Sequence, residues 1–504
     1  MSYSLLKSGT DIRGFAADGF ENEPLFLSDE KVEKIAVAFV SFLCKKTGKN
    51  QSELVVSVGH DSRVSAQRIK SAILRGLTSQ GVTVYDCALS STPAMFMSVL
   101  DLNCDGAVQI TASHHPWERN GLKFFTKDGG VESSDITTIL SDAQCISDSV
   151  FSLNADKVIT IDYMSTYAEN LQDMIKKGVS APDYNKPLKG YRIIVDAGNG
   201  AGGFYAHKVL EPLGADISGS QFLEPDGMVP NHIPNPENKQ AMESITKATV
   251  ESKADLGIIF DTDVDRAGCV DKNGQEINRN NLVALASAIA LDGADGGVIV
   301  TDSVTSDGIP AFIKSIGGEH YRYKRGYRNV INKQIELNNQ GIYCPLAIET
   351  SGHAAFKENY YLDDGAYLIT KIIIYMAKNG GSQAIEKTLS SLKQPEESVE
   401  MRFSILADDF KSYGKKVLDK LVDCFSNKTG WKIADDNHDG IRISADQNNG
   451  DGWLLLRLSV HDPVMPLNVE SNSVGGVRKM ISVFNEFIKE QKELDIKPLE
   501  KFLK

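Results

Sequence analysis

The stretch ELVVSVGHDSRVSAQRIKSAILRGLTSQGVTVYD, from Glu53 to Asp86, carries the pattern that decides the fold. An apolar, β-branched run leads into a loop of glycine, aspartate and serine, then an amphipathic helical pattern, a glycine and a second apolar run. This order predicts a strand, a helix and a second strand parallel to the first. Two later stretches repeat the order, namely YRIIVDAGNGAGGFYAHKVLEPLGADIS from Tyr191 and GGVIVTDSVTSDGIPAFIKSIGGEHYRY from Gly296.

The three repeats indicate three α/β domains, because parallel strands need helices on both faces of their sheet. The loops that carry function in such sheets follow the carboxyl ends of the strands. The C-terminal part of the chain has a different pattern. There, GWLLLRLSV (452–460) and PLNVES (466–471) predict strands, and residues 474–494 predict a helix, which suggests a smaller α+β domain.

The predicted fold class is therefore α/β, with three consecutive α/β domains that have mixed sheets and a C-terminal α+β domain. We place the domains at residues 1–153, 154–274, 275–385 and 386–504, and the polar stretch SSLKQPEESVE (390–400) marks the last junction. The chain length of 504 residues agrees with this division, since one domain usually holds roughly 100 to 200 residues.

Composition and charge narrow the function classes. The apolar share of 41% and the charged share of 24% are typical of an ordered globular protein. The net charge of −13 argues against a nucleic acid or an anionic membrane as partner, since both attract basic surfaces. Seven scattered cysteines without CxxC pairs indicate reduced thiols and a cytoplasmic location. We expect neither a secretory signal nor a membrane-spanning segment.

The segment DTDVDR, Asp261 to Arg266, follows the apolar run LGIIF, where a strand is predicted to end. The carboxylates of Asp261, Asp263 and Asp265 repel one another unless a bound cation or a raised pKa offsets their charge. Hard oxygen ligands of this kind favour Mg²⁺. The segment does not fit an EF-hand, because Arg266 stands where that loop needs glycine. The alternative interpretation is a solvated turn.

The segment TASHHPWERNGLKFF, Thr111 to Phe125, places Ser113 before two histidines and a proline. A phosphorylated serine would carry close to two negative charges and would complete the oxygen shell of a metal. The alternative is an ordinary turn hydroxyl or helix cap. The segment does not match the G-x-S-x-G elbow, which disfavours an ordinary serine hydrolase.

Two further loops allow more than one interpretation. DAGNGAGG, from Asp196, has the glycine spacing of a dinucleotide-binding loop, but no other feature supplies hydride chemistry. ETSGHAAF, Glu349 to Phe356, offers a carboxylate, a hydroxyl and an imidazole around a glycine, which would suit the hydroxyls of a sugar. The alternative for its histidine is a buried ring with a satisfied hydrogen bond.

Together, these motifs resemble the α-D-phosphohexomutase superfamily, which includes phosphoglucomutase and phosphomannomutase. TASHHP followed by NGLK, and then DTDVDR, carry the resemblance, and the matching loops keep their order along nearly the whole chain. The resemblance implies four domains around a central cleft. In chain order, these domains would supply a phosphoserine loop, a metal loop, a sugar loop and a phosphate loop.

The resemblance also implies roles for individual residues. The metal ligands that it implies are Ser113, as the phosphorylated catalytic serine, and Asp261, Asp263 and Asp265. The further catalytic residues that it implies are Lys123, Arg13, Arg266 and His353. For substrate binding it implies Glu349 and Ser351, which would hold O3 and O4 of a sugar.

The phosphate loop departs from the pattern of that superfamily. The superfamily has Arg-Pro-Ser-Gly-Thr-Glu-Pro and a further arginine, whereas this chain has RLSVHDPVMP at residues 457–466. The resemblance makes Arg457, Ser459 and His461 the expected phosphate-binding residues, with His461 in the place of a threonine. The segment therefore predicts that the substrate phosphate is bound differently from the pattern of the superfamily.

These features predict an isomerase of the phosphoglucomutase and phosphomannomutase type, a monomer or homodimer that uses Mg²⁺ and acts on a small hexose phosphate. It would interconvert the 1-phosphate and 6-phosphate of glucose or mannose through a phosphoserine and a 1,6-bisphosphate. Near alternatives are phosphoglucosamine and pentose phosphate mutases. More distant ones are an aspartyl-phosphate phosphatase, with Asp261 as nucleophile, and a catalytically inactive sugar-phosphate binding protein.

Overall fold

The computed structural model describes residues 2–17, 25–459 and 462–504. The chain divides into two compact units. The first unit contains Met1–Ile289 and Ser351–Thr388, and the second contains Ala290–Thr350 and Leu389–Lys504.

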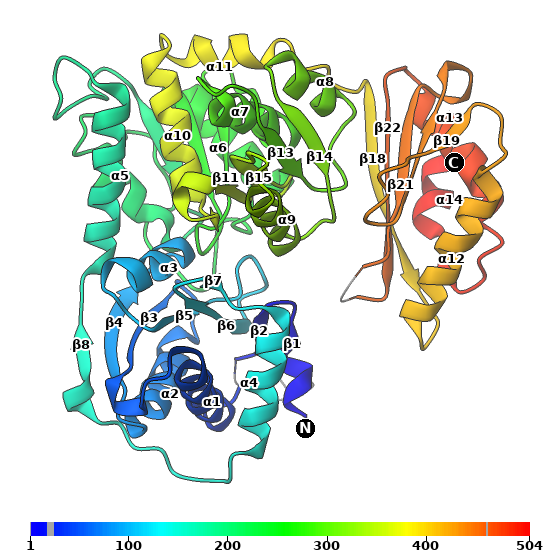
Figure 1. Ribbon diagram of the computed structural model, residues 1–504. Helices are drawn as coiled ribbons and strands as arrows, with labels where there is room; N and C mark the ends of the chain where they lie inside the picture. The colour runs from blue at the N-terminus through cyan, green and yellow to red at the C-terminus, as the bar shows by residue number, and fades with distance from the viewer. Residues whose placement is uncertain (1, 18–24, 460–461) are drawn as a thin grey trace. The chain divides into compact units, whose positions relative to one another are not determined.

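The N-terminal domain of the first unit has a mixed sheet with the strand order β1-β2-β6-β5-β3-β4-β8 (Figure 1). The predicted strand–helix–strand unit forms β3 (Val55–His60), α2 (Ala66–Ser79) and β4 (Thr83–Leu89), and the two strands are parallel. The remaining elements are β1 (Lys7–Ser8), β2 (Asp11–Phe15), α1 (Asp29–Thr47), α3 (Thr92–Asp101), β5 (Gly106–Ile110), β6 (Arg119–Thr126), β7 (Gly129–Gly130), α4 (Ser133–Cys145) and β8 (Val158–Thr160).

Local sequence explains how these elements begin, end and pack. The Oγ of Ser28 accepts a hydrogen bond from the N–H of Lys31 at 3.5 Å and caps α1, which ends at Gly48 in the left-handed conformation. Phe39 of α1 and Val56 of β3 belong to one buried apolar core. Every residue of β5 is buried, as expected for a central strand covered on both faces.

The second domain of the first unit has the strand order β12-β11-β10-β9. β9 (Ile193–Asp196) and β10 (Leu256–Phe260) are parallel, and β11 (Ala267–Asp271) returns antiparallel to β10. The remaining elements are α5 (Tyr163–Val179), α6 (Lys239–Ser252) and β12 (Glu276–Ile277).

The second predicted strand–helix–strand unit is less regular than expected. Its helix is replaced by a 3-10 turn (Ala201–Gly203) and a π-helical turn (Tyr205–Leu210). Its second strand is reduced to isolated bridges, such as the parallel bridge between Arg192 and Asp216. The carboxylate of Asp216 accepts the N–H of Ser218 at 2.9 Å, and such a local bond favours a turn over continued strand pairing.

The first unit also contains β16 (Ala354–Phe356), β17 (Leu362–Asp363) and α10 (Gly365–Lys378). β16 and β17 are antiparallel, and α10 packs beside α5 (Figure 1). α7 (Arg279–Leu291) and α11 (Ser382–Leu389) each span a boundary between the two units.

The second unit begins with a parallel arrangement. β13 (Val298–Thr301) lies between β14 (Glu319–Arg322) and β15 (Leu346–Ile348) and is parallel to both. α8 (Gly308–Ser315) connects β13 to β14, so the third predicted strand–helix–strand unit is confirmed. α9 (Tyr327–Asn339) connects β14 to β15.

The C-terminal part of the second unit is an antiparallel sheet with the order β19-β20-β21-β22-β18-β23. Its helices α12, α13 and α14 lie on one face of the sheet (Figure 1). The predicted helix over 474–494 ends at residue 488, because Leu494 pairs with Ile405 in the sheet. The elements are β18 (Glu397–Ile405), α12 (Phe410–Phe425), β19 (Trp431–Ile433), β20 (Ile441–Ala445), β21 (Gly452–Leu456), β22 (Val464–Ser471), α13 (Gly476–Ile488), β23 (Leu494–Asp495) and α14 (Lys497–Leu503).

The predicted fold class is confirmed, with three α/β domains that have mixed sheets and a C-terminal domain built on an antiparallel sheet. The domain limits at residues 153, 274 and 385 stay a prediction. Across the described parts of the chain, none of the helices combines the length and the apolar character that a bilayer crossing requires.

Candidate active site

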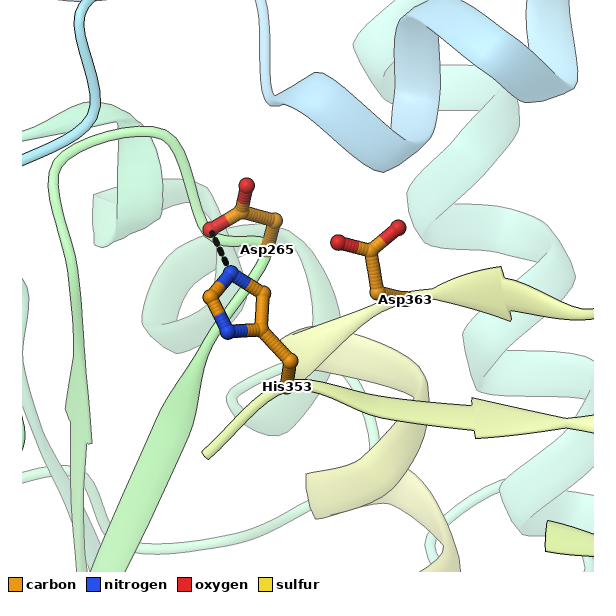
Figure 2. Close-up of side chains that lie close together, drawn as sticks. All are labelled: Asp265, His353 and Asp363. Carbon is orange, nitrogen blue, oxygen red and sulfur yellow. Dashed lines mark ion pairs between the residues drawn. The ribbon is translucent and has the colours of Figure 1, made fainter. Parts of the chain in front are cut away.

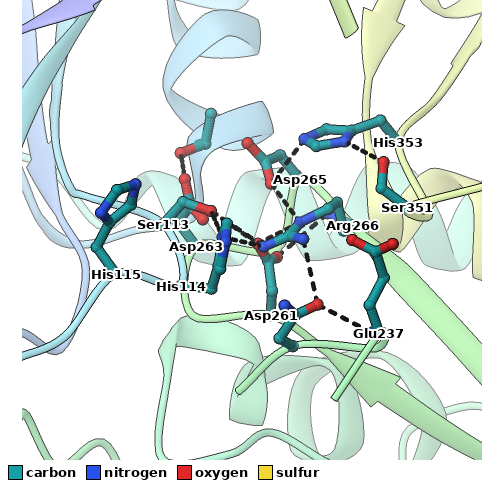
Figure 3. Close-up of polar contacts among 12 residues, drawn as sticks. Ser113, His114, His115, Glu237, Asp261, Asp263, Asp265, Arg266, Ser351 and His353 are labelled. Atoms are coloured by element: carbon teal, nitrogen blue, oxygen red, sulfur yellow. Dashed lines mark hydrogen bonds and ion pairs between the residues drawn. The ribbon is translucent and has the colours of Figure 1, made fainter. Parts of the chain in front are cut away.

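The predicted catalytic serine lies in the loop that connects β5 to β6. Ser113 has a φ of 51°, in the left-handed region that residues with a Cβ rarely adopt. Its Oγ is 3.2 Å from Oδ2 of Asp261 and 3.2 Å from Nη2 of Arg266 (Figure 3). Only 4% of Ser113 is exposed. The serine hydroxyl therefore faces the predicted metal ligands.

The three predicted aspartate ligands form one buried cluster between β10 and β11. Ligand oxygens of Asp261, Asp263 and Asp265 lie within 4.8 Å of one another. Within the described residues, Oδ1 of Asp263 and Oδ1 of Asp265 are buried and have no hydrogen-bond partner. Hard, unpartnered carboxylate oxygens are the donors that a divalent cation such as Mg²⁺ requires. The cluster therefore fits the predicted metal.

Two cationic side chains lie against this cluster. Nζ of Lys123, on β6, is 3.1 Å from Oδ2 of Asp263 and 2.5 Å from Oδ2 of Asp265. Nε of Arg266 is 3.0 Å from Oδ2 of Asp261. Because three carboxylates face two cations, the side chains leave an excess of negative charge in a buried site, which a bound cation would offset.

The environment separates the pKa values of the aspartates. Burial raises the pKa of Asp261 well above its usual value, and the charge of Asp265 adds to the shift. Burial also acts to raise the pKa of Asp265, but Lys123 and Arg266 outweigh it, so the pKa of Asp265 is lowered. Asp265 is therefore held ionised by its positive neighbours.

His114 also belongs to the site, although the sequence did not single it out. Nη2 of Arg266 is 2.6 Å from Nδ1 of His114. Since a guanidinium only donates hydrogen bonds, Nδ1 accepts, and the neutral ring carries its proton on Nε2. Burial, and then the charge of Arg266, lower the pKa of His114 to about 2, in agreement with a neutral ring. The signal available in the sequence was its place directly after Ser113.

A second contact has no signal in the sequence. Oγ1 of Thr92, at the start of α3, donates a hydrogen bond to Oδ2 of Asp263 at 2.5 Å. The backbone N–H of Thr92 also donates to the carbonyl oxygen of Asp263 at 2.8 Å. Thr92 thus fixes both the side chain and the backbone of one predicted ligand.

His353 and Ser351 reach the aspartate cluster from the segment before β16. Nε2 of His353 is 3.7 Å from Oδ1 of Asp265, and Nδ1 of His353 is 3.0 Å from Oγ of Ser351 (Figure 3). Ligand atoms of Asp265, His353 and Asp363 lie within 4.8 Å of one another (Figure 2). Asp363, on β17, is a residue that the sequence did not predict for the site.

Arg13 lies on β2, opposite Gly121 of the neighbouring strand β6. Its Nη2 is 2.9 Å from Oδ2 of Asp11. Burial lowers the pKa of His115 to about 3, and the charge of Arg13 adds to this shift. The charge of Arg13 therefore acts on His115 in the loop that carries Ser113, and the catalytic role of Arg13 stays a prediction.

The predicted phosphate-binding arginine lies in the second unit. Nη1 of Arg457 is 3.5 Å from Oδ2 of Asp439, and Nε of Arg457 is buried without a hydrogen-bond partner among residues 2–17, 25–459 and 462–504. The same Asp439 oxygen accepts hydrogen bonds from Oγ of Ser303 at 2.7 Å and from the N–H of Arg325 at 3.2 Å. Arg457 therefore shares its carboxylate partner with two other donors, and its role in phosphate binding stays a prediction.

The other predicted binding residues of the second unit have local contacts. Oγ of Ser459 accepts the N–H of Asp462 at 3.2 Å. Oε1 of Glu349 accepts the N–H of Gly326 at 2.5 Å. His461 lies outside the described residues, and its place in phosphate binding stays a prediction.

The glycines of DAGNGAGG have a packing role next to the metal loop. A Cβ on Gly200 would lie 2.6 Å from the carbonyl oxygen of Thr262, between Asp261 and Asp263. The N–H of Ala201 donates to that same oxygen at 2.8 Å. Close approach of two backbones, rather than dinucleotide binding, therefore accounts for this glycine.

The fold is that of the α-D-phosphohexomutase superfamily. The signatures described as "Phosphoglucomutase/phosphomannomutase, alpha/beta/alpha" domains I, II and III match residues 7–146, 166–274 and 278–395. The chain therefore belongs to the phosphoglucomutase/phosphomannomutase family.

Known relatives of the chain carry several substrate names. A "Phosphoglucomutase/phosphomannomutase" of Thermococcus kodakarensis is 30% identical over 506 residues, which covers 97% of this chain and 98% of that protein. A "Phosphoglucosamine mutase" of Nautilia profundicola is 31% identical over 386 residues, or 74% of this chain and 79% of that protein. A solved structure of a phosphoglucomutase/phosphomannomutase family protein from Burkholderia thailandensis has a TM-score of 0.77 and 25% identity, with 98% of each chain covered.

Proposed function

We propose that this chain is a magnesium-dependent phosphohexomutase that interconverts the 1-phosphate and 6-phosphate of glucose or mannose. The observation that carries the proposal is the position of Ser113 Oγ, 3.2 Å from Oδ2 of Asp261 and 3.2 Å from Nη2 of Arg266. A serine oxygen in this position can be phosphorylated beside a divalent cation and a guanidinium. Membership of the family supports the same reaction class.

The reaction consists of two phosphoryl transfers. In the first, the bond between phosphorus and Oγ of Ser113 breaks, and a bond forms between phosphorus and the free hydroxyl oxygen of the sugar. The proton of that hydroxyl passes to Nε2 of His353 and from there to the oxygen left on Ser113, so that the serine hydroxyl is restored and the sugar becomes a 1,6-bisphosphate. In the second, the other phosphoryl group passes to Oγ of Ser113, and the serine proton returns through His353 to the oxygen that is left on the sugar.

Charge neutralisation is the main contribution of the site, since phosphoryl transfer needs little covalent help from side chains. Lys123 and Arg266 would donate N–H groups to the oxygens of the transferred phosphoryl group. Asp261, Asp263 and Asp265 would hold Mg²⁺, which when bound neutralises negative charge on the reacting oxygens.

Two orientations of the sugar require binding groups away from the reacting atoms. Glu349 and Ser351 would hold O3 and O4, and Arg457 and Ser459 would hold the phosphate that does not react. Arg457 suits this role because its side chain is mostly buried and its Nε has no hydrogen-bond partner in the part of the chain that the structure describes. His461 completes the set of proposed phosphate-binding residues.

The first test replaces the serine. We expect Ser113→Ala to fold normally and to lose conversion of glucose 1-phosphate to glucose 6-phosphate by roughly 10⁴-fold or more, as for other enzymes that lose a nucleophile. Ser71→Ala, an exposed serine on α2 of the same domain, is the matched control and should keep full activity. Turnover of Ser113→Ala near that of the control would refute the proposal.

The second test locates the phosphate. After incubation with labelled glucose 1,6-bisphosphate, peptide mass spectrometry should find the label on Ser113. Label on Asp261 would instead identify an aspartyl-phosphate phosphatase. Binding of the bisphosphate without transfer to any residue would identify an inactive binding protein.

A second candidate substrate is glucosamine phosphate, which the similarity to the Nautilia profundicola protein favours. Initial rates with the 1-phosphates of glucose, mannose, glucosamine and ribose would rank the candidates. A preference of more than tenfold for the glucosamine compound would reassign the substrate and keep the reaction.

A further inference from the structure

The guanidinium of Arg63 is buried among backbone carbonyls of residues 113–119, the serine loop. Nη1 of Arg63 donates to the carbonyl oxygens of Pro116 and Arg119, both at 2.8 Å. Nη2 donates to the carbonyl oxygen of His115 at 2.6 Å and to that of Ser113. Arg63 itself is only 5% exposed.

The number of donors in this arrangement is specific to arginine. The two terminal nitrogens of a guanidinium carry four N–H bonds in one plane. Here each of these four bonds has a separate carbonyl partner within residues 113–119. A lysine has three N–H bonds on one nitrogen, so it cannot serve four carbonyls that surround a planar fork.

The other backbone group of Ser113 is held by the same segment of the chain. The N–H of Ser113 donates to Oγ1 of Thr111 at 2.9 Å, and Oγ1 of Thr111 donates to Oδ2 of Asp61 at 2.6 Å. Oδ1 of Asp61 accepts the backbone N–H of Arg63 at 3.0 Å, and Oδ2 lies 3.4 Å from Nε of Arg63. The hydrogen bonds thus form a closed ring through both the N–H and the C=O of Ser113.

This ring explains how Ser113 keeps a backbone conformation that is unfavourable for it. A φ of 51° places Ser113 in the left-handed region, which a serine adopts only when its surroundings hold it there. In this conformation Oγ faces Asp261 and Arg266. A relaxed backbone would turn the hydroxyl away from both.

We propose that Arg63, together with Asp61 and Thr111, is a positioning residue that fixes the left-handed conformation of Ser113 and so aims its hydroxyl at the metal loop. This inference rests on the proposed function, because it assigns Ser113 as the reacting group. The Arg63 side chain contacts backbone carbonyls of the loop and the carboxylate of Asp61, so it acts through the loop. Its loss should therefore reduce turnover more than substrate binding.

The test compares Arg63→Lys with wild type and with Arg68→Lys. Arg68, on α2, also donates to two carbonyls, those of Ala16 and Leu27, but holds a different segment and is the matched control. We expect Arg63→Lys to lower kcat for glucose 1-phosphate by on the order of 10²-fold, with KM within about threefold, as for a misplaced reacting group. Arg68→Lys should leave both constants within about threefold of wild type.

A second pair of variants keeps the inference testable if Arg63→Lys does not fold. Thr111→Val keeps the shape of the side chain and removes the hydroxyl that joins Ser113 to Asp61, whereas Thr111→Ser keeps the hydroxyl. We expect Thr111→Val to lower kcat about tenfold at unchanged KM and to slow labelling of Ser113 by glucose 1,6-bisphosphate, and Thr111→Ser to restore both.

The possible outcomes separate this inference from the proposed function. Wild type that neither converts a sugar phosphate nor becomes labelled on Ser113 would overturn both. Active wild type, with a folded Arg63→Lys and Thr111→Val that retain kcat within about threefold, would overturn the inference alone. A loss of activity in Arg68→Lys equal to that in Arg63→Lys would also overturn it, because a general effect on the domain would then explain both.

Discussion

The serine–metal site of the first unit and the phosphate-binding segment of the second unit hold their charges differently. The proposed serine–metal site consists of Ser113, Lys123, Asp261, Asp263, Asp265 and Arg266, and the proposed phosphate-binding segment is residues 457–466. In the first, Arg266 and Asp261 are 2% and 0% exposed and 2.9 Å apart. In the second, Arg457 and Asp439 are 11% and 18% exposed and 3.5 Å apart.

Both pairs are largely buried, so the difference lies in how closely their charges are paired. Removing one partner of a fully buried ion pair leaves an uncompensated charge, at a cost of about 3 to 5 kcal/mol. The Arg457–Asp439 contact is longer, so its partners attract each other less strongly. The serine–metal site keeps the motifs of its superfamily, whereas residues 457–466 depart from them. The comparison predicts effects on turnover in the first region and on substrate affinity in the second.

Among the changes that test this comparison, the largest effect is expected for Asp263→Asn. This change removes a predicted metal ligand and a charge that Lys123 and Thr92 contact. We expect kcat to fall by about 10³-fold, the equivalent of several kcal/mol of charge stabilisation. The coupled assay with glucose 1-phosphate and added Mg²⁺ measures it. Asp173→Asn, an exposed aspartate of α5, is the control, and a loss below tenfold in Asp263→Asn would contradict the assignment.

Arg457→Ala should weaken substrate binding by the second region and leave the chemistry of the first region unchanged. A hydrogen bond to a charged group contributes about 1.5 to 3 kcal/mol, so KM for the sugar phosphate should rise roughly 10- to 100-fold. We expect kcat at saturating substrate to change by less than about threefold, because the reacting atoms are not touched. Arg402→Ala, an exposed arginine of the same domain, should leave KM unchanged. A loss confined to kcat would contradict the division between the two regions.

Gly200→Ala tests whether close packing of Gly200 against the backbone of Thr262 holds the metal loop in place. The new methyl group would meet the backbone of Thr262 at 2.6 Å and displace the metal loop. We expect a loss of unfolding free energy of about 1 to 3 kcal/mol, as for other overpacked sites, together with lower kcat. Thermal unfolding and steady-state rates measure both. Gly130→Ala, whose Cβ would have neighbours only at 3.8 Å and beyond, is the tolerated control.

The smallest effect is the pH dependence of stability that we expect from His232. This residue contacts Asp196 of β9, in the same domain as the aspartate cluster. Burial acts to lower the pKa of His232, but the hydrogen bond and charge of Asp196 outweigh it and raise the pKa above 6.5. The stabilisation is therefore fully present below pH 6.5 and is lost as pH rises through the folded-state pKa. We expect the unfolding temperature of wild type to fall between pH 6 and pH 8.5 more than that of His232→Asn. Equal falls would contradict this assignment.

The fold could be predicted to the extent that local patterns determine it. The alternation of strand and helix patterns gave three α/β domains, and the unit from Glu53 formed as expected. The prediction for the strand–helix–strand stretch from Tyr191 was less accurate. There, the side chain of Asp216 makes a local turn that competes with strand pairing. The end of the last helix was missed because it depends on pairing between Leu494 and a distant strand.

Residues of the candidate site could be predicted where they stand in a short sequence motif. Residues that only the fold brings to the site could not be predicted. Ser113, Lys123 and the aspartates stand in short motifs, and the structure brings them into contact. Thr92 reaches Asp263 across 171 positions of sequence, so no spacing reveals it. Arg63 contacts backbone carbonyl groups. Every residue type has such a group, so these contacts leave no signal in the sequence. The roles of Glu349 and His461 stay predictions.

The left-handed backbone of Ser113 has a practical consequence for trapping the substrate. Alanine in that position would keep the backbone strain of serine, whereas glycine, without a Cβ, adopts positive φ at no steric cost. A glycine variant would thus be an inactive protein whose loop adopts this backbone conformation without steric strain. For crystals that capture an intact sugar bisphosphate, it is the better choice of the two.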